Sequence, residues 1–207
     1  MSQRLTAHRA AKPQTANVFE FNSVEDSPSM YQDDIDFVLT SPPYGDSHTT
    51  VAHEQYSRLS AAWLGLPHAE KIDSKLMGSG KRQIVDNFDS KELDIAIKEI
   101  TSIDEKRAIE VSGFYVDLQK SVDNVSPLVK RGGHVCYVVG NRKVKGVVLP
   151  TDIAAKNFFE KNNFRHIKTF HRSIPNKRMP SRNSPSNITG ITHETMSREY
   201  IVVLQKT

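Results

Sequence analysis

A short apolar run that stops at two prolines constrains the fold of this chain more than any other feature. Ile35-Asp-Phe-Val-Leu39 is followed directly by Thr40-Ser-Pro-Pro-Tyr44. An uninterrupted apolar run of this length is typical of a strand that is buried on both faces, as in a parallel sheet. Two consecutive prolines cannot continue such a strand because they lack backbone donors. The sequence therefore predicts a buried strand over residues 35–39 that ends in a stiff loop.

Strand patterns and helical patterns alternate along the rest of the chain. Apolar residues recur at three- and four-residue spacing over residues 90–130, which predicts a helical region. Arg131-Gly-Gly133 is typical of a turn, and Thr151 is a candidate N-cap for a helix that ends near Lys161. Further strands are expected over residues 134–140, 164–174 and 199–205. This alternation predicts an α/β sheet with helices on its faces.

Composition narrows the class of protein. The 207 residues are enough for one domain with a sizeable core, or for a domain with an insertion. No apolar run is long enough to cross a bilayer, and residues 1–15 are a polar arm without the apolar core of a secretory signal. One cysteine and eight histidines without ligand spacing predict neither a disulfide framework nor a metal site. We expect a cytoplasmic protein.

Basic side chains cluster toward the C-terminus. The net charge is only +4, but Glu194 is the only acidic residue between residues 165 and 198. The basic residues of this stretch are Arg165, Lys168, Arg172, Lys177, Arg178, Arg182 and Arg198. Such a cluster is the electrostatic footprint expected for contacts with phosphates. A solvated face without a partner accounts equally well for the charge alone.

The loop after the first strand has the parts needed to hold a planar base by its exocyclic amine. Pro42 and Pro43 stiffen the loop and leave their carbonyls as acceptors. Ser41 adds a hydroxyl, and Tyr44 presents a flat ring on which a flipped base can stack. The amine lone pair of cytosine or adenine is delocalised into the ring, which makes the amine a poor nucleophile. Hydrogen bonds accepted from its protons favour pyramidalisation and direct the lone pair toward an electrophilic methyl group.

Residues 35–44 resemble the catalytic motif of the S-adenosylmethionine-dependent amino-methyltransferases, in which Asp, Asn or Ser precedes Pro-Pro and an aromatic residue. Serine at this position, after a threonine, is more typical of the cytosine-N4 DNA enzymes than of the adenine-N6 enzymes. The resemblance assigns Ser41 and the Pro42 carbonyl to the target amine and Tyr44 to stacking.

The resemblance also implies the Rossmann-like sheet of a class I methyltransferase. Its cofactor would be S-adenosyl-L-methionine, with Thr40 and Asp26 as candidate contacts. The glycine-rich turn that binds the cofactor in this family is absent. Gly78-Ser-Gly80 is the nearest match, but its flanks do not resemble a strand and a helix. Residues 16–207 therefore resemble a methyltransferase catalytic domain without its cofactor-motif half.

Three accounts of the missing half are open. The chain is one part of a split enzyme whose second polypeptide carries the glycine-rich cofactor motif, a truncated fragment, or a subunit that binds DNA without catalysis. We favour the split enzyme, because a half-sheet alone exposes the edge of a central strand.

Several residues near the predicted crevice are candidates for nucleic-acid contacts. They are Asp46, Ser47, Asn141, Arg142, Lys177, Arg178 and Arg182. The first two follow the loop and serve equally well as helix caps. The next two follow the second strand at its carboxyl end, where open α/β sheets bind ligands. The last three belong to a basic loop with interleaved prolines, which suits phosphate or guanine contacts or serves only solubility.

Residues 46–105 interrupt the sheet pattern beside the loop and are a candidate target-recognition insertion. Within them, Trp63 lies on a short amphipathic segment, where a core role is expected over base stacking. Cys136 lies in a buried-strand pattern and no Pro-Cys pair occurs. Core packing is therefore expected for Cys136, and the cysteine-nucleophile chemistry of cytosine-C5 enzymes is not.

These observations predict a prokaryotic, nucleoid-associated subunit that methylates cytosine N4 in double-stranded DNA within a restriction–modification system. Methyl transfer from S-adenosyl-L-methionine is expected to need the partner chain. An RNA amino-methyltransferase and a non-catalytic DNA-recognition subunit remain the alternatives.

Overall fold

The structure is a computed structural model of the 207-residue chain. It describes residues 16–17, 21–26, 31–43, 58–65, 69, 77–78, 82–174, 182–183, 193–194 and 198–207. Among the helices in these ranges, none combines the length and the apolar character that a bilayer crossing needs.

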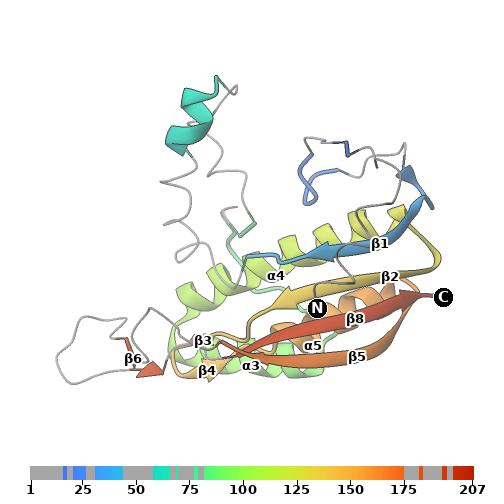
Figure 1. The fold of residues 1–207 in the computed structure, drawn as a ribbon. Coiled ribbons are helices and arrows are strands. Elements are labelled where there is room, and N and C mark those ends of the chain that lie inside the picture. Colours follow the sequence, from blue (N-terminus) through green and yellow to red (C-terminus); the bar gives the residue numbers. More distant parts are fainter. Residues whose placement is uncertain are drawn as a thin grey trace.

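Helices and strands alternate along the described part of the chain (Figure 1). The main helical elements are α3 (Lys91–Ile103), α4 (Glu105–Val125), the 3-10 turn η3 (Ser126–Leu128) and α5 (Thr151–Lys161), and residues 58–63 form a further short helix. The strands are β1 (Ile35–Thr40), β2 (Val129–Val139), β3 (Lys143–Val144), β4 (Val147–Val148), β5 (Phe164–Ser173), β6 (Arg182–Asn183), β7 (His193–Glu194) and β8 (Arg198–Lys206).

Four of these strands form one sheet in the order β1-β2-β8-β5. β1 runs parallel to β2, whereas β8 runs antiparallel to both β2 and β5. A parallel pair needs a crossover connection, and the helical segment from α3 to η3 supplies it. The predicted α/β fold and its four strand patterns are confirmed.

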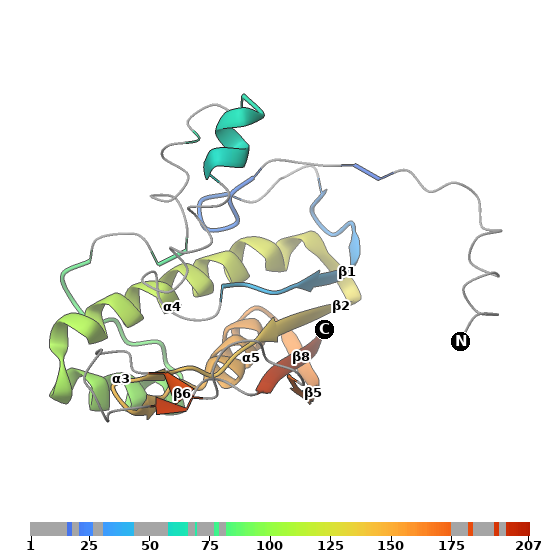
Figure 2. The ribbon, with the colours of Figure 1, turned by 60° about the vertical axis from the view of Figure 1, so that its left-hand side comes forward.

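Helices α3, α4 and α5 lie on one face of this sheet (Figures 1 and 2). Val135, Tyr137 and Leu204 are buried and alternate with less buried neighbours along β2 and β8. The Tyr137 ring meets the Phe159 ring of α5 edge-on, with 4.8 Å between the ring centroids. Since strand side chains alternate between faces, every second residue of the strands faces this helical layer.

The predicted helical region divides into two helices at Asp104. This residue is the N-cap of α4, and its carboxylate accepts a hydrogen bond from the Arg107 backbone N–H at 3.0 Å. Lys145 pairs with the same carboxylate at 2.9 Å. The hydrogen bond from Lys145, followed by that from Arg107, lowers the pKa of Asp104. The break lets α3 turn back and pack beside α4.

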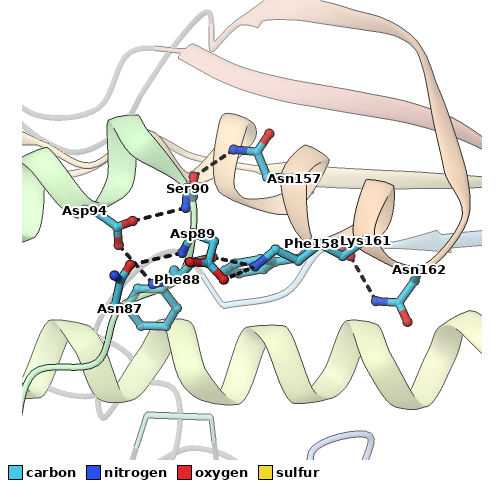
Figure 3. A network of polar contacts seen from close by, with 9 residues as sticks. All are labelled: Asn87, Phe88, Asp89, Ser90, Asp94, Asn157, Phe158, Lys161 and Asn162. Carbon is cyan, nitrogen blue, oxygen red and sulfur yellow. Dashed lines mark hydrogen bonds and ion pairs between the residues drawn. The ribbon is translucent and has the colours of Figure 1, made fainter.

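The turn before α3 is held by a polar network that Figure 3 shows. The Asp94 carboxylate accepts hydrogen bonds from the backbone N–H groups of Phe88, at 3.0 Å, and Ser90, at 3.1 Å. Asn157 of α5 donates to Ser90 Oγ at 2.8 Å, and Lys161 donates to the Phe88 carbonyl at 2.7 Å. The network thus fixes the start of α3 against α5.

Thr151 is not the N-cap of α5, contrary to the prediction. It is the first residue of the helix, and its buried hydroxyl is 2.8 Å from the hydroxyl of Tyr115. Asn141 takes over the capping, because its side-chain oxygen accepts a hydrogen bond from the Asp152 N–H at 3.2 Å. A cap from a distant residue leaves no local sequence pattern.

Residues 131–133 are not a turn but part of β2, which is irregular there. Ile35 pairs with Val129 and Phe37 pairs with His134, so five steps along β2 match two steps along β1. Gly133 approaches the backbone of Asp36: a Cβ on Gly133 would lie 3.1 Å from the Asp36 carbonyl oxygen. Glycine is used here for close backbone contact and not for chain reversal.

Two burial predictions are wrong. β1 is not buried on both faces, because Phe37 and Leu39 are 54% and 67% exposed while Val38 packs against the core. Trp63 is 89% exposed, so it is not a core residue. Burial of β1 on both faces would need a second layer of structure on the face that carries Phe37 and Leu39. The described residues contain no such layer.

Candidate active site

The loop that follows β1 lies at the carboxyl end of the parallel strand pair. Thr40 pairs in register with Tyr137 of β2, so the two strands end side by side. Pro42 is buried and Pro43 half-buried, whereas Ser41 is exposed. The buried proline anchors the loop to the body of the protein and leaves the serine at the surface. This is the arrangement that a hydroxyl acceptor for an external ligand requires.

Tyr137, the register partner of Thr40, faces the helical side of the sheet. Its burial raises the pKa of the Tyr137 hydroxyl, and a hydrogen bond with Ser121 opposes that shift. The phenol is therefore neutral at any physiological pH, since a phenol ionises only near pH 10 even in water. Tyr137 is a packing residue against Phe159 and not an acid or base.

Asn141 and Arg142 follow the carboxyl end of β2, at the same end of the strands as the loop after β1. The Asn141 side chain donates to Asp152 Oδ1 at 2.8 Å and accepts from the Asp152 N–H. The Arg142 carbonyl accepts a hydrogen bond from Leu149 N at 2.7 Å. The structure therefore shows Asn141 as a residue that positions the start of α5 beside the candidate site. Nucleic-acid contact by either residue stays a prediction.

Asp26 lies in a short segment that contacts α4. Ser23, in the same short segment, lies 2.8 Å from Ser121 of α4 through their hydroxyls, and its carbonyl accepts from Asn124. Ser121 also hydrogen-bonds Tyr137, which is the register partner of Thr40. A cofactor contact for Asp26 stays a prediction.

Other predicted contact residues lie outside the described residues. They are Tyr44, Asp46, Ser47, Lys177 and Arg178. Arg182 is described by its backbone only, in the small antiparallel pair of β6 with β7. The roles of all six stay predictions.

Residues 77–78 and 82–86 are anchored to α4, which no local sequence pattern indicates. The buried Asp117 of α4 accepts hydrogen bonds from Gly78 N at 2.8 Å and from Arg82 at 3.1 Å. Ser112 accepts from Asp86 N at 2.9 Å. Gly113 leaves room for the Arg82 side chain, whose Cδ would be 3.2 Å from an added Cβ. The chain downstream of the loop after β1 is thus tied to α4. The sequence signal that could have indicated this anchor is Asp117, a single acidic residue on the buried side of α4.

Cys136 is partly buried on β2, and burial raises the pKa of its thiol. A raised pKa disfavours the thiolate, which is the nucleophilic form of cysteine. The predicted core packing of Cys136 is met only in part, because the residue pairs in register with the exposed Leu39 and not with the side chains that face the helices.

The chain has a relative among known proteins, although no protein-family model matches it. It is 42% identical over 191 residues to the type II methyltransferase M.MvaI of Kocuria varians. This chain is similar to part of a type II methyltransferase. The matched region covers 86% of the chain but only 42% of that relative, so the chain spans less than half of its length. The resemblance to DNA methyltransferases is confirmed at this level.

Solved structures also align with the chain. A putative DNA modification methylase from Thermus thermophilus, complexed with S-adenosyl-L-methionine, aligns over 89% of this chain and 53% of its own. The TM-score is 0.44 and the sequence identity 18%. Another crystal structure of that protein gives a TM-score of 0.43 at 17% identity, over 90% of this chain and 52% of its own.

Proposed function

We propose that this chain is the base-handling part of a DNA methyltransferase that uses S-adenosyl-L-methionine to methylate N4 of cytosine. The observation that carries the proposal is the Thr40–Pro43 loop at the carboxyl end of a parallel strand, where α/β sheets bind ligands. The identity with a type II methyltransferase over most of the chain supports methyl transfer.

In this proposal the loop holds the target amine. Ser41 Oγ and the Pro42 carbonyl accept hydrogen bonds from the amine protons, and the ring of Tyr44 stacks on the flipped base. These contacts turn the nitrogen lone pair toward the methyl group, which S-adenosyl-L-methionine supplies from its sulfonium. The chain needs no covalent intermediate with the base, because positioning of the two reactants provides most of the acceleration.

Cytosine N4 is proposed as the target because serine precedes the two prolines and follows a threonine. The basic residues Lys177, Arg178 and Arg182 are proposed to contact DNA phosphates, with Asp46 and Ser47 near the target strand. RNA methylation and DNA binding without catalysis are the competing outcomes. Action within a restriction–modification system of a prokaryotic cytoplasm belongs to the same proposal.

The cofactor side of the site is not complete in the described residues. No strand in the described ranges is followed by a glycine-rich turn that opens into a helix. We therefore propose that the glycine-rich turn comes from a second polypeptide, as in a split enzyme. Thr40 and Asp26 are the proposed contributions of this chain to cofactor binding.

Alanine substitutions in the loop test this function. The assay mixes the chain with a complementing segment, defined as the part of the Kocuria varians protein outside the matched residues, produced as a separate polypeptide. In Ser41→Ala and Tyr44→Ala we expect methyl transfer to fall about 100-fold or more, because each change removes an interaction with the reacting amine. DNA affinity, measured by fluorescence anisotropy, should change only a few-fold.

Ser102→Ala is the matched control. Ser102 is an exposed serine of α3 whose hydroxyl bonds only its own helix, to the Glu99 carbonyl at 2.7 Å. This control should methylate DNA at the rate of the unchanged chain. Undiminished methyl transfer in both loop variants would remove residues 41–44 from the active site.

A further inference from the structure

The helical residues 58–63 carry an exposed apolar side. Leu59 and Trp63 are four positions apart, so they lie on the same side of the helix, and they are 76% and 89% exposed. Leu64, the next residue, is 68% exposed. Ala61 lies on the other side of the helix and is only 7% exposed, so the helix has a packed side and an exposed side. We call Leu59, Trp63 and Leu64 the apolar tip.

The end of this helix is fixed by its own backbone. The Leu64 N–H donates to the Ser60 carbonyl at 3.0 Å, and the Gly65 N–H donates to the Ala62 carbonyl at 3.1 Å. Gly65 has a φ of 69°, the left-handed conformation with which many helices end. Figures 1 and 2 show the helix standing clear of the four-stranded sheet. Contiguous exposed apolar residues on such an element mark an interaction surface.

The size of the apolar tip distinguishes between kinds of partner. A stable protein interface covers about 800 Å² on each side. Three side chains cannot supply this area, because even a large aromatic side chain buries at most about 250 Å². A single apolar wedge between base steps, by contrast, is enough to unstack or kink duplex DNA. The tip therefore fits DNA better than a second protein.

The charge around the apolar tip also suits DNA. Among residues 55–69, Arg58 is the single Lys or Arg, and Asp and Glu do not occur. Acidic residues beside the tip would repel phosphates, whereas a cation attracts them. The tip also follows the loop after β1 along the chain, since Leu59 comes sixteen residues after Pro43. The chain thus leads from the proposed base-holding loop to the tip.

Base flipping creates a place for such a wedge, and the inference therefore rests on the proposed function. A base that rotates out of the duplex into an enzyme pocket leaves a gap in the stack and loses its stacking energy. We infer that Trp63 enters this gap and stacks on the bases beside it, with Leu59 and Leu64 packed around the ring. Stacking of an aromatic side chain on bases does not depend on which bases they are. Trp63 then keeps the target base outside the duplex while Ser41 holds its amine.

A duplex with one abasic site tests this inference, because it contains the gap whatever the recognition sequence is. Trp63 is the single tryptophan of the chain, so 5-fluorotryptophan labelling gives one fluorine NMR signal. The labelled chain is mixed with the unlabelled complementing segment and then with the abasic duplex or the same duplex without the gap. We expect the abasic duplex to shift the Trp63 signal. In fluorescence anisotropy it should bind about tenfold more tightly than the intact duplex.

Substitutions of Trp63 separate stacking from other contacts. In Trp63→Ala the preference for the abasic duplex should disappear, whereas Trp63→Phe, which keeps a flat ring, should retain most of it. Ile95→Ala is the matched control, because Ile95 is a 55% exposed apolar residue of α3, and its loss should leave the preference unchanged. Circular dichroism melting checks that each variant folds.

Each outcome decides one claim. A preference that persists in Trp63→Ala, a Trp63 signal that does not move when the abasic duplex binds, or absence of DNA binding would overturn the inference. A shift caused by the complementing segment without DNA would also overturn it, because the apolar tip would then contact protein. A preference that depends on Trp63, without methyl transfer, would leave the wedge standing and refute the proposed function. Methyl transfer at an unchanged rate in Trp63→Ala would refute the wedge alone.

Discussion

At the scale of single residues, Gly133 decides how closely β1 approaches β2. A Cβ at this position would lie 2.9 Å from both the Lys130 carbonyl oxygen and the Val129 Cγ1. Gly133→Ala should therefore destabilise the protein by about 1–3 kcal/mol, the usual cost of forcing an extra methyl group into packed surroundings. Urea unfolding followed by circular dichroism measures the change. The candidate loop follows β1, so methyl transfer should fall as well.

Gly113→Ala is the control for this prediction. It adds the same methyl group, but the nearest atom is Cδ of the flexible Arg82 side chain, at 3.2 Å. Alanine also favours the helix by up to about 1 kcal/mol relative to glycine. The two effects oppose each other, so a stability close to that of the unchanged chain is expected. Equal destabilisation by both substitutions would contradict the assigned role of Gly133.

At the scale of elements, the turn before α3 depends on Asp94. Its carboxylate satisfies two backbone N–H groups, those of Phe88 and Ser90, which are themselves almost fully buried. Asp94→Ala leaves both donors unpaired and should destabilise the fold by about 2 kcal/mol. Thermal unfolding checks this value. Glu92→Ala, in the exposed part of the same first helical turn, should change stability by less than about 0.5 kcal/mol. A loss that is equal in both variants would show that the network does not fix α3.

The elements also show which parts of the fold local sequence can predict. Strands β1, β2, β5 and β8 were predictable because apolar and β-branched residues concentrate between polar or turn segments, although the apolar run of β1 did not mean burial on both faces. The break at Asp104 was missed because the three- and four-residue spacing of apolar residues continues from α3 into α4 without interruption. The cap of α5 was missed because Asn141 supplies it from a different element. Contacts that join distant segments are set by tertiary packing, which a local pattern does not contain.

At the scale of the whole molecule, the sequence predicted half of a methyltransferase sheet, and the described residues form a four-stranded sheet. The apolar run of β1 predicted burial on both faces, yet Phe37 and Leu39 are exposed. The predicted burial of β1 and the exposure of Phe37 and Leu39 agree if another polypeptide segment covers this face of the sheet. The position of the Thr40–Pro43 loop at the strand end was predictable, because prolines end strands. The roles of Tyr44 and of the basic loop rest on sequence alone.

The most direct test of the central claim is a nucleoside analysis of methylated DNA. The chain, the complementing segment and S-adenosyl-L-methionine are incubated with duplex DNA, which is then digested and examined by mass spectrometry. Reactions without the chain, and with its Ser41→Ala variant, are the controls. We predict N4-methylcytosine only in the reaction with the unchanged chain. N6-methyladenine would contradict the cytosine assignment. The absence of any methylated nucleoside would contradict the claim that this chain is the base-handling part of a DNA methyltransferase.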